Sequence, residues 1–189
     1  MSSNRNICSA AERRRATLRW ASLALVILVA GCGRREAPPP PRPTPPPPIS
    51  RERALPTTSY VATAASIDLY DIRAGEMAMQ RSSNPRLRDY AARLVEDHRG
   101  TAAQLSFAGR RLNLLPSAVL APPHQALIDA LATAGDFDTM FIRQQTDVHR
   151  DSQRMHAAYA ARGDSQTLRP VAANAAQVEA RHLAALRSL

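Results

Sequence analysis

The stretch from residue 84 to residue 112, NPRLRDYAARLVEDHRGTAAQLSFAGRRL, decides the fold. It opens with Asn84 and Pro85, the pattern of a helix N-cap followed by a first helical residue. Apolar residues then recur every three or four positions, which predicts an amphipathic helix. The expected buried stripe comprises Leu87, Ala91, Leu94, His98, Thr101, Leu105, Ala108 and Leu112.

The same period runs through the chain on both sides of this helix. A helix is predicted from about 59 to 80, with the stripe Tyr60, Ala64, Ile67, Asp71, Ala74 and Ala78. Two more are predicted at about 137–162, ended by Gly163, and at about 166–186, with Pro170 in the first turn. The connection 114–135 contains three prolines and a short helix at about 124–133. Two tight helical hairpins joined by a long crossover predict an all-α, ferritin-like four-helix bundle.

The N-terminal residues resemble an export signal. Arg13, Arg14, Arg15 and Arg19 precede the apolar run WASLALVILVA at 20–30, which is too short to span a bilayer permanently. The run ends in Leu28-Val29-Ala30-Gly31-Cys32, which resembles the bacterial lipobox. We therefore predict a signal peptide at 1–31 and lipidation of Cys32, including palmitate-type acyl chains that anchor the protein in the membrane. Gly33 and Arg34 follow the cysteine where an Asp would signal inner-membrane retention, so the outer membrane is favoured, with the domain in the periplasm.

A proline-rich segment separates this signal from the globular part. Residues 37–48, APPPPRPTPPPP, lack most backbone donors and predict a polyproline II rod of roughly 35 Å. The expected organisation is a lipidated tether at 32–55 and a helical domain at 56–187. Aromatic residues are few, so the core of that domain is expected to consist of Leu, Ala and Val.

Charge argues against nucleic acid as a partner. The formal net charge is +9, but the chain from residue 54 onward has 15 Arg and 13 acidic residues, which are interspersed rather than clustered. Cys8 lies in the expected signal and Cys32 is the expected acylation site, so no thiol is left for a disulfide or a metal site.

The apolar stripe of each predicted helix of the bundle carries an ionisable residue near its middle. These are Asp71, His98, His149 and His182, and the helical rise places them at a similar height. Gln145, Asp97 and Glu179 lie beside them as supporting groups, whereas His124 and His156 are expected to be solvated. A carboxylate with three imidazoles suits zinc, copper or iron. The same residues also suit a hydrogen-bonded core network or, for some histidines, a solvated flank.

Two enzyme classes find little support. Glu179 and His182 form the Glu-x-x-His pattern of di-iron bundles, but Val95 occupies the matching position before His98 and the helix at 137–162 contains no Glu. The sequence also lacks Gly-x-Ser-x-Gly and a glycine-rich phosphate loop. A binding or structural module of unknown ligand or protein partner is therefore the leading prediction, and a metal-binding or metal-dependent redox protein is the alternative.

Four segments resemble a known family, the domain of unknown function 4142. They are Ala65-Ser66 to Asp71, Asn84-Pro85 to Asp97-His98, Phe141 with Gln145 and His149, and Ala172 with His182-Leu183. The likeness spans about residues 56–187. Asp71 stands where the family usually has Glu, and Gln177 where a proline is common. The resemblance implies a ferritin-like bundle, often called an outer-membrane protein, and implies no particular activity.

Overall fold

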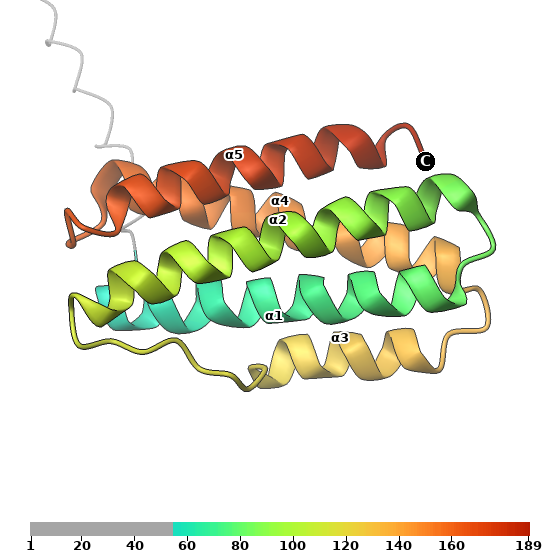
Figure 1. Ribbon diagram of the computed structural model, residues 1–189, viewed down its shortest axis with the longest axis horizontal. Coiled ribbons are helices and arrows are strands. Elements are labelled where there is room, and N and C mark those ends of the chain that lie inside the picture. Colours follow the sequence, from blue (N-terminus) through green and yellow to red (C-terminus); the bar gives the residue numbers. More distant parts are fainter. Residues whose placement is uncertain (1–54) are drawn as a thin grey trace, which may run out of the picture. The chain divides into compact units, whose positions relative to one another are not determined.

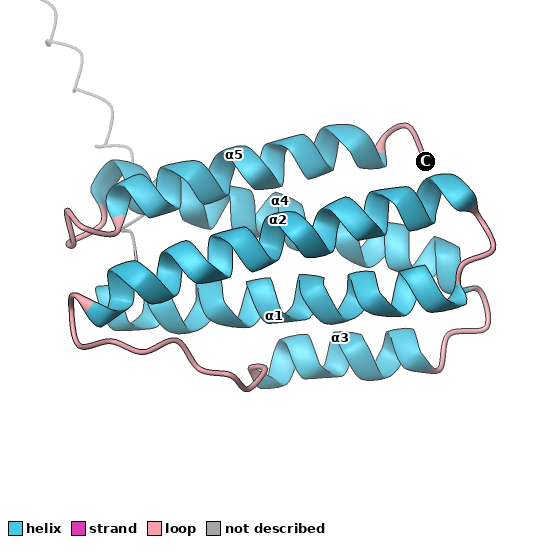
Figure 2. Cartoon of the chain, viewed as in Figure 1, coloured by secondary structure: helices cyan, strands magenta, loops and turns pink. Residues whose placement is uncertain are grey.

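The described part of the chain, residues 55–189 of a computed structural model, is built from helices. They are α1 (Thr57–Arg81), α2 (Pro85–Arg110), α3 (Pro122–Ala132), α4 (Phe137–Arg162) and α5 (Arg169–Leu186). Figure 2 shows helices and connecting loops and no strand in this part of the chain. The prediction of an all-α fold is confirmed. The expected signal peptide, Cys32 and the proline-rich segment 37–48 lie outside the described residues.

The helices form two antiparallel hairpins, α1 with α2 and α4 with α5, joined by a long connection that carries α3 (Figure 1). Because this connection returns along the bundle, α2 and α4 run in the same direction, as the ferritin-like connectivity requires. The shorter helix α3 packs against α1 and α4. None of the helices between residues 55 and 189 combines the length and hydropathy that crossing a bilayer demands.

The helix ends follow local chemistry. The Asn84 side chain accepts a hydrogen bond from the backbone N–H of Arg86 at 3.0 Å, and Pro85 begins α2, as the sequence predicts. Helix α4 ends at Arg162, before Gly163, whose φ is −56°. A Cβ at Gly163 would lie 2.5 Å from the Tyr159 ring, so this glycine is needed for close approach rather than for a left-handed backbone. Helix α5 begins three residues later than expected, because 165–168 form a separate turn.

The core has two apolar halves. One contains Tyr70, Leu87, Tyr90 and Phe141, and the other contains Tyr60, Leu105, Tyr159 and Leu168, among others. The expectation of a core made only of Leu, Ala and Val is wrong, since all four tyrosines of the chain are buried in these halves. Between the halves lies a layer of buried polar residues, which we call the polar layer. It comprises Asp68, Asp71, His98, Gln145, His149, Glu179 and His182.

Candidate metal centre

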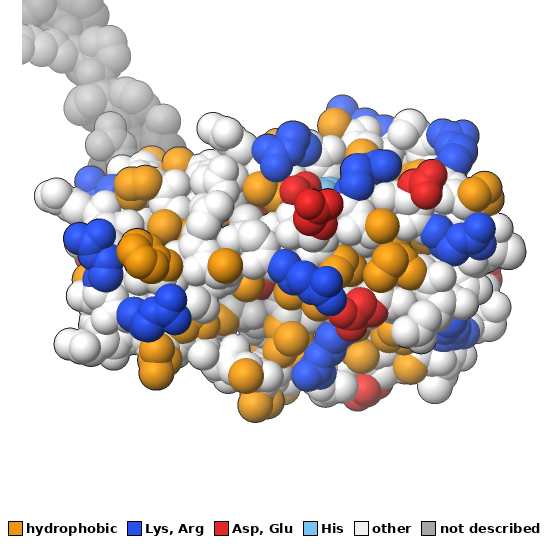
Figure 3. Space-filling model, in the orientation of Figure 1, with side chains coloured by type: hydrophobic (Ala, Val, Ile, Leu, Met, Phe, Trp, Pro, Cys, Tyr) orange, Lys and Arg blue, Asp and Glu red, His pale blue; other side chains and the backbone are white. Residues whose placement is uncertain are grey.

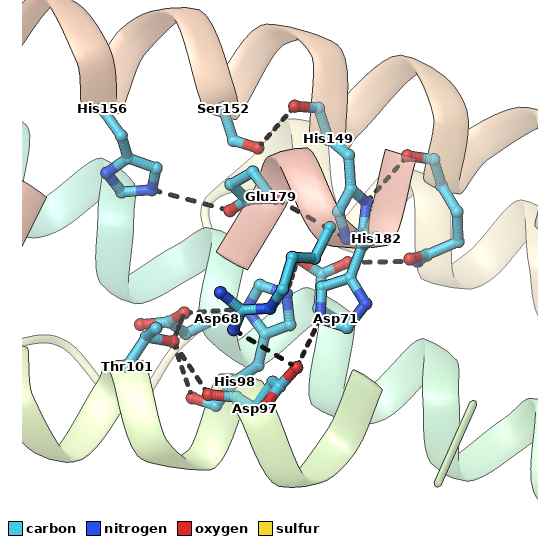
Figure 4. Close-up of polar contacts among 12 residues, drawn as sticks. Asp68, Asp71, Asp97, His98, Thr101, His149, Ser152, His156, Glu179 and His182 are labelled. Atoms are coloured by element: carbon cyan, nitrogen blue, oxygen red, sulfur yellow. Dashed lines mark hydrogen bonds and ion pairs between the residues drawn. The ribbon is translucent and has the colours of Figure 1, made fainter. Parts of the chain in front are cut away.

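Helices α1 and α2 contribute the first pair of groups to the polar layer (Figure 4). His98 Nδ1 lies 3.0 Å from Asp68 Oδ1, and the Thr101 hydroxyl donates to the same oxygen at 2.6 Å. A carboxylate can only accept, so Nδ1 carries the proton and Nε2 is directed elsewhere. His98 Nε2 lies 3.5 Å from Asp71 Oδ2, in the centre of the bundle.

Helices α4 and α5 contribute a second pair of similar design. His149 Nδ1 donates to the carbonyl oxygen of Gln145 at 2.8 Å, one turn earlier in α4. The other ring nitrogen, Nε2, lies 3.6 Å from Glu179 Oε2. The Gln145 side chain donates to Asp71 Oδ1 at 3.1 Å and so connects the two pairs.

The atoms that face one another in this layer have no hydrogen-bond partner among the described residues. They include Asp71 Oδ2, His98 Nε2, His149 Nε2 and Glu179 Oε2, all fully buried. Each unpaired buried polar group costs about 1–3 kcal/mol. The donor atoms of these four residues lie within 4.8 Å of one another. Donors bound to one tetrahedral ion at about 2.0–2.2 Å lie about 3.3–3.6 Å apart. The separations of 3.5 and 3.6 Å match that spacing and are longer than good hydrogen bonds.

The hydrogen bonds around these donors are those of metal-binding histidines. Such histidines donate their second ring N–H to a carboxylate or backbone carbonyl, which fixes the tautomer. Asp68 serves His98 in this way, and the Gln145 carbonyl serves His149. The donor set of two imidazoles and two carboxylates therefore fits a divalent transition metal, and the four ligands come from four different helices.

His182 gives the layer a third imidazole. Donor atoms of His98, His149 and His182 also lie within 4.8 Å of one another. The ring of His182 lies 5.4 Å from that of His98 and 5.2 Å from that of His149. The two groups of donors share His98 and His149. We call His98, His149 and His182 the imidazole set, and Asp71, His98, His149 and Glu179 the carboxylate set.

The electrostatics of the layer show a shortage of positive charge. Burial raises the pKa of Asp71 to about 6 and that of Glu179 to about 8. Burial alone would lower the pKa of His98, but Asp71, the hydrogen bond to Asp68 and Glu179 together raise it to about 10. Burial and the neighbouring His98 lower the pKa of His149 well below its usual value and that of His182 to about 3. Near neutral pH the layer therefore binds protons at Glu179 and His98, and a divalent cation is able to replace them.

The residues singled out by sequence occupy different positions in this layer. Asp71, His98, His149 and His182 come together at mid-bundle. Glu179 lies among the donors. Gln145 donates to Asp71 through its side chain and accepts from His149 through its carbonyl oxygen. Asp97 lies at the edge of the layer, on the surface side of His182.

Sequence reasoning missed Asp68, although its position three residues before Asp71 places both on one face of α1. The expectation that His156 is solvated is wrong: it is 3% exposed, and its Nδ1 lies 2.9 Å from the Tyr60 hydroxyl. His156 follows His149 by two helical turns, and that spacing was the available signal. His124 is half-buried, with its Nδ1 2.7 Å from the Ser66 hydroxyl.

Fold and site together define an all-α four-helix bundle with a buried layer of carboxylates and imidazoles. The chain belongs to the family described as "Domain of unknown function (DUF4142)", whose profile matches residues 42–189. The resemblance stated from sequence is confirmed. A comparison with curated protein sequences gave no match.

Solved structures of similar fold include one described as CopM in the Cu(II)-bound form. It is 18% identical, with a TM-score of 0.61, over 71% of this chain and 95% of that chain. The structure described as CopM in the Cu(I)-bound form is also 18% identical, with a TM-score of 0.60, over 71% of this chain and 94% of its own. The apo form of CopM is 19% identical, with a TM-score of 0.56, over 69% and 93%. At this level of identity the likeness shows a shared fold.

Proposed function

We propose that the protein binds a divalent transition metal at the carboxylate set, Asp71, His98, His149 and Glu179. The observation that carries this proposal is the convergence of buried atoms from these four residues that have no hydrogen-bond partner in the described part of the chain. A purely structural network is the competing interpretation. It accounts for the bonds of Asp68, Thr101 and Gln145, but it leaves the central atoms unpaired at a cost in stability.

Cu²⁺ is the metal that the donor set favours. The carboxylate set contains nitrogen and oxygen donors and no sulfur, which suits Cu²⁺ or Zn²⁺ better than the soft ions Cu⁺ and Ag⁺. Among divalent ions bound by such donors, Cu²⁺ stands at the top of the usual affinity order. The Cu(II)-bound form of CopM supports the proposal, since a protein of the same fold binds Cu²⁺.

The sequence supports a place in the cell envelope for this activity. We propose that Cys32 anchors the chain to a membrane, with the outer membrane favoured, and that the helical domain lies in the periplasm. The lipobox-like segment and the short apolar run before it carry this part of the proposal. The protein would then bind metal in the compartment that external metal reaches first.

Metal-dependent stability tests the proposed site. The full chain, purified in detergent and treated with chelator, is melted with and without Cu²⁺. Binding to the folded state adds about 2.7 kcal/mol at a free ion concentration 100 times Kd, so the melting temperature rises. The rise should vanish in His98→Ala and His149→Ala and should shrink as pH falls from about 8 to about 6, because protons compete with the ion for His98, Glu179 and Asp71. His124→Ala, outside the polar layer, should keep it.

Elemental analysis of the protein as purified identifies the ion. Copper at about one equivalent supports the proposal. If no metal co-purifies and Cu²⁺, Zn²⁺ and Fe²⁺ all leave the melting temperature unchanged, the polar layer is a structural network and the proposal fails.

A further inference from the structure

His182 has neighbours on two sides. On its inner side it belongs to the imidazole set, which shares His98 and His149 with the carboxylate set. On its outer side, its Nε2 lies 3.2 Å from Asp97 Oδ2. It therefore connects the buried donors with a carboxylate that reaches solvent.

Exposure rises step by step along this line of side chains. The exposed fraction of the side chain is 1% for His98, 5% for His182 and 38% for Asp97. Arg181, whose guanidinium nitrogen lies 3.9 Å from Asp97 Oδ2, is 59% exposed. Figure 3 shows the corresponding face, where a histidine is visible among acidic and basic side chains between α5 and α2. Asp97 belongs to α2, and Arg181 and His182 belong to α5.

We propose that Asp97 and His182 form the access route by which a metal ion enters the polar layer, and that Arg181 closes the outer end of this route. The inference rests on the proposed function, because it assigns a path to the same site. The ion pair between Arg181 and Asp97 is exposed, and pairs of this kind contribute little to stability, so it opens readily. An arriving cation can replace the guanidinium as the partner of Asp97 and take His182 as its next ligand.

The overlap of the two donor sets provides the remaining step. An ion held by the imidazole set already has His98 and His149 as ligands. It reaches the carboxylate set when Asp71 and Glu179 replace His182, without leaving the two shared histidines. The carboxylate set can supply two negative charges, so a divalent cation is held more strongly there than by three neutral imidazoles.

A second opening competes with this route. A cavity of about 400 Å³ on the side of α1, α3 and α4 is lined by Ile67, His124, Asp151 and Ser152, among others. Ser152 is buried beside the layer, with its hydroxyl 3.3 Å from the carbonyl oxygen of His149. Asp147 and Asp151 are the exposed carboxylates of that cavity, and Asp151 lies next to Ser152, so an Asp151 variant distinguishes the two routes.

Rates of uptake and release test the inference. Cu²⁺ is mixed rapidly with the chelator-treated full chain in detergent, and the change in tyrosine fluorescence gives the rate of uptake. Excess EDTA is then added to the loaded protein, and the return of the fluorescence gives the rate of release. Asp97→Asn should slow uptake and release by at least tenfold, while Kd changes by much less, because both rates fall together. Arg181→Gln should speed uptake severalfold. Glu96→Gln is the matched control: it removes the same charge from the neighbouring, exposed position of α2 and should leave both rates within twofold.

The outcomes separate the inference from the function beneath it. If Asp97→Asn binds and releases Cu²⁺ at the rates of the unchanged protein, the access route is wrong although the metal site stands. The proposed access route is also wrong if Asp151→Asn slows uptake and release while Asp97→Asn does not. The cavity beside α1, α3 and α4 would then be the route. If the unchanged protein shows no saturable binding of Cu²⁺, Zn²⁺ or Fe²⁺, the proposed function itself fails.

Discussion

The two ring nitrogens of His98 have different partners. Nδ1 is held by Asp68, and Nε2 faces Asp71 across 3.5 Å. Because Nδ1 keeps its proton in the bond to Asp68, Nε2 is the nitrogen that loses its proton when a metal binds, and the charge of Asp68 makes that nitrogen more basic. Asp68 is thus a positioning residue for the proposed metal site rather than a ligand.

Replacement of Asp68 tests this role. Asp68→Asn keeps an acceptor for His98 but removes the charge, so we expect a loss of about 10–100-fold in Cu²⁺ affinity. Competition with a coloured chelator measures the affinity. Glu76→Gln, which removes an equal charge from an exposed position of α1, should change it by less than threefold. Equal affinities of Asp68→Asn and the unchanged protein would show that the Asp68–His98 bond has no influence on the metal.

His156 makes the metal-free domain sensitive to acid. Burial, followed by the charge of His98, lowers its pKa from 6.5 to about 3. The unfolded chain therefore binds a proton at a higher pH than the folded chain, and stability is lost as pH falls below about 6.5. This histidine accounts for about 1.4 kcal/mol per pH unit in that range.

The variant His156→Gln isolates this contribution. Between pH 6.5 and pH 5 it should lose about 2 kcal/mol less free energy of unfolding than the unchanged protein. Urea unfolding in the presence of a chelator gives both values. Parallel losses in the two proteins would mean that His156 does not titrate on unfolding.

At the scale of the elements, helices α2 and α4 begin at a residue whose side chain caps the first turn. Asn84 caps α2 and Asp136 caps α4, each through a side-chain oxygen that accepts a backbone N–H. Asn84→Ala should lower the free energy of unfolding by about 1 kcal/mol, because Arg86 N–H loses its acceptor. Ser83→Ala, at the adjacent exposed position, should stay within about 0.5 kcal/mol. Thermal or urea unfolding measures the free energy of unfolding of both variants. Equal decreases in Asn84→Ala and Ser83→Ala would contradict the capping role.

The elements were predictable because their signals are local. Periodicity of 3.6 and the stop signals at 82–85 and at Gly163 define helix ends to within a few residues. The site was only partly predictable. Asp71 and His98 lie within apolar stripes, where a polar residue attracts notice. Asp68 and His156 lie at positions whose burial depends on which helix packs opposite, and one helix considered alone does not carry that information.

At the scale of the whole molecule, the proposed place of the bundle in the cell envelope rests on the N-terminal sequence. We expect Cys32 to be the first residue of the mature chain and to carry a lipid. Mass spectrometry of the membrane fraction should show the adduct, and Cys32→Ala should block processing and lipidation. Cys8→Ala, within the expected signal, should leave both intact. A mature chain that starts elsewhere with unmodified Cys32 would refute the anchor and leave the metal proposal untouched.

The division of the core into two apolar halves affects how the domain opens. The apolar contacts of the two halves are separate, so without metal we expect the end of the bundle that holds one half to open locally more readily than the whole domain unfolds. An ion bound to ligands from α1, α2, α4 and α5 would tie the halves together, because opening either end would then strain the same four bonds. One ion at mid-bundle would therefore slow amide hydrogen exchange at both ends, far from any residue that touches it.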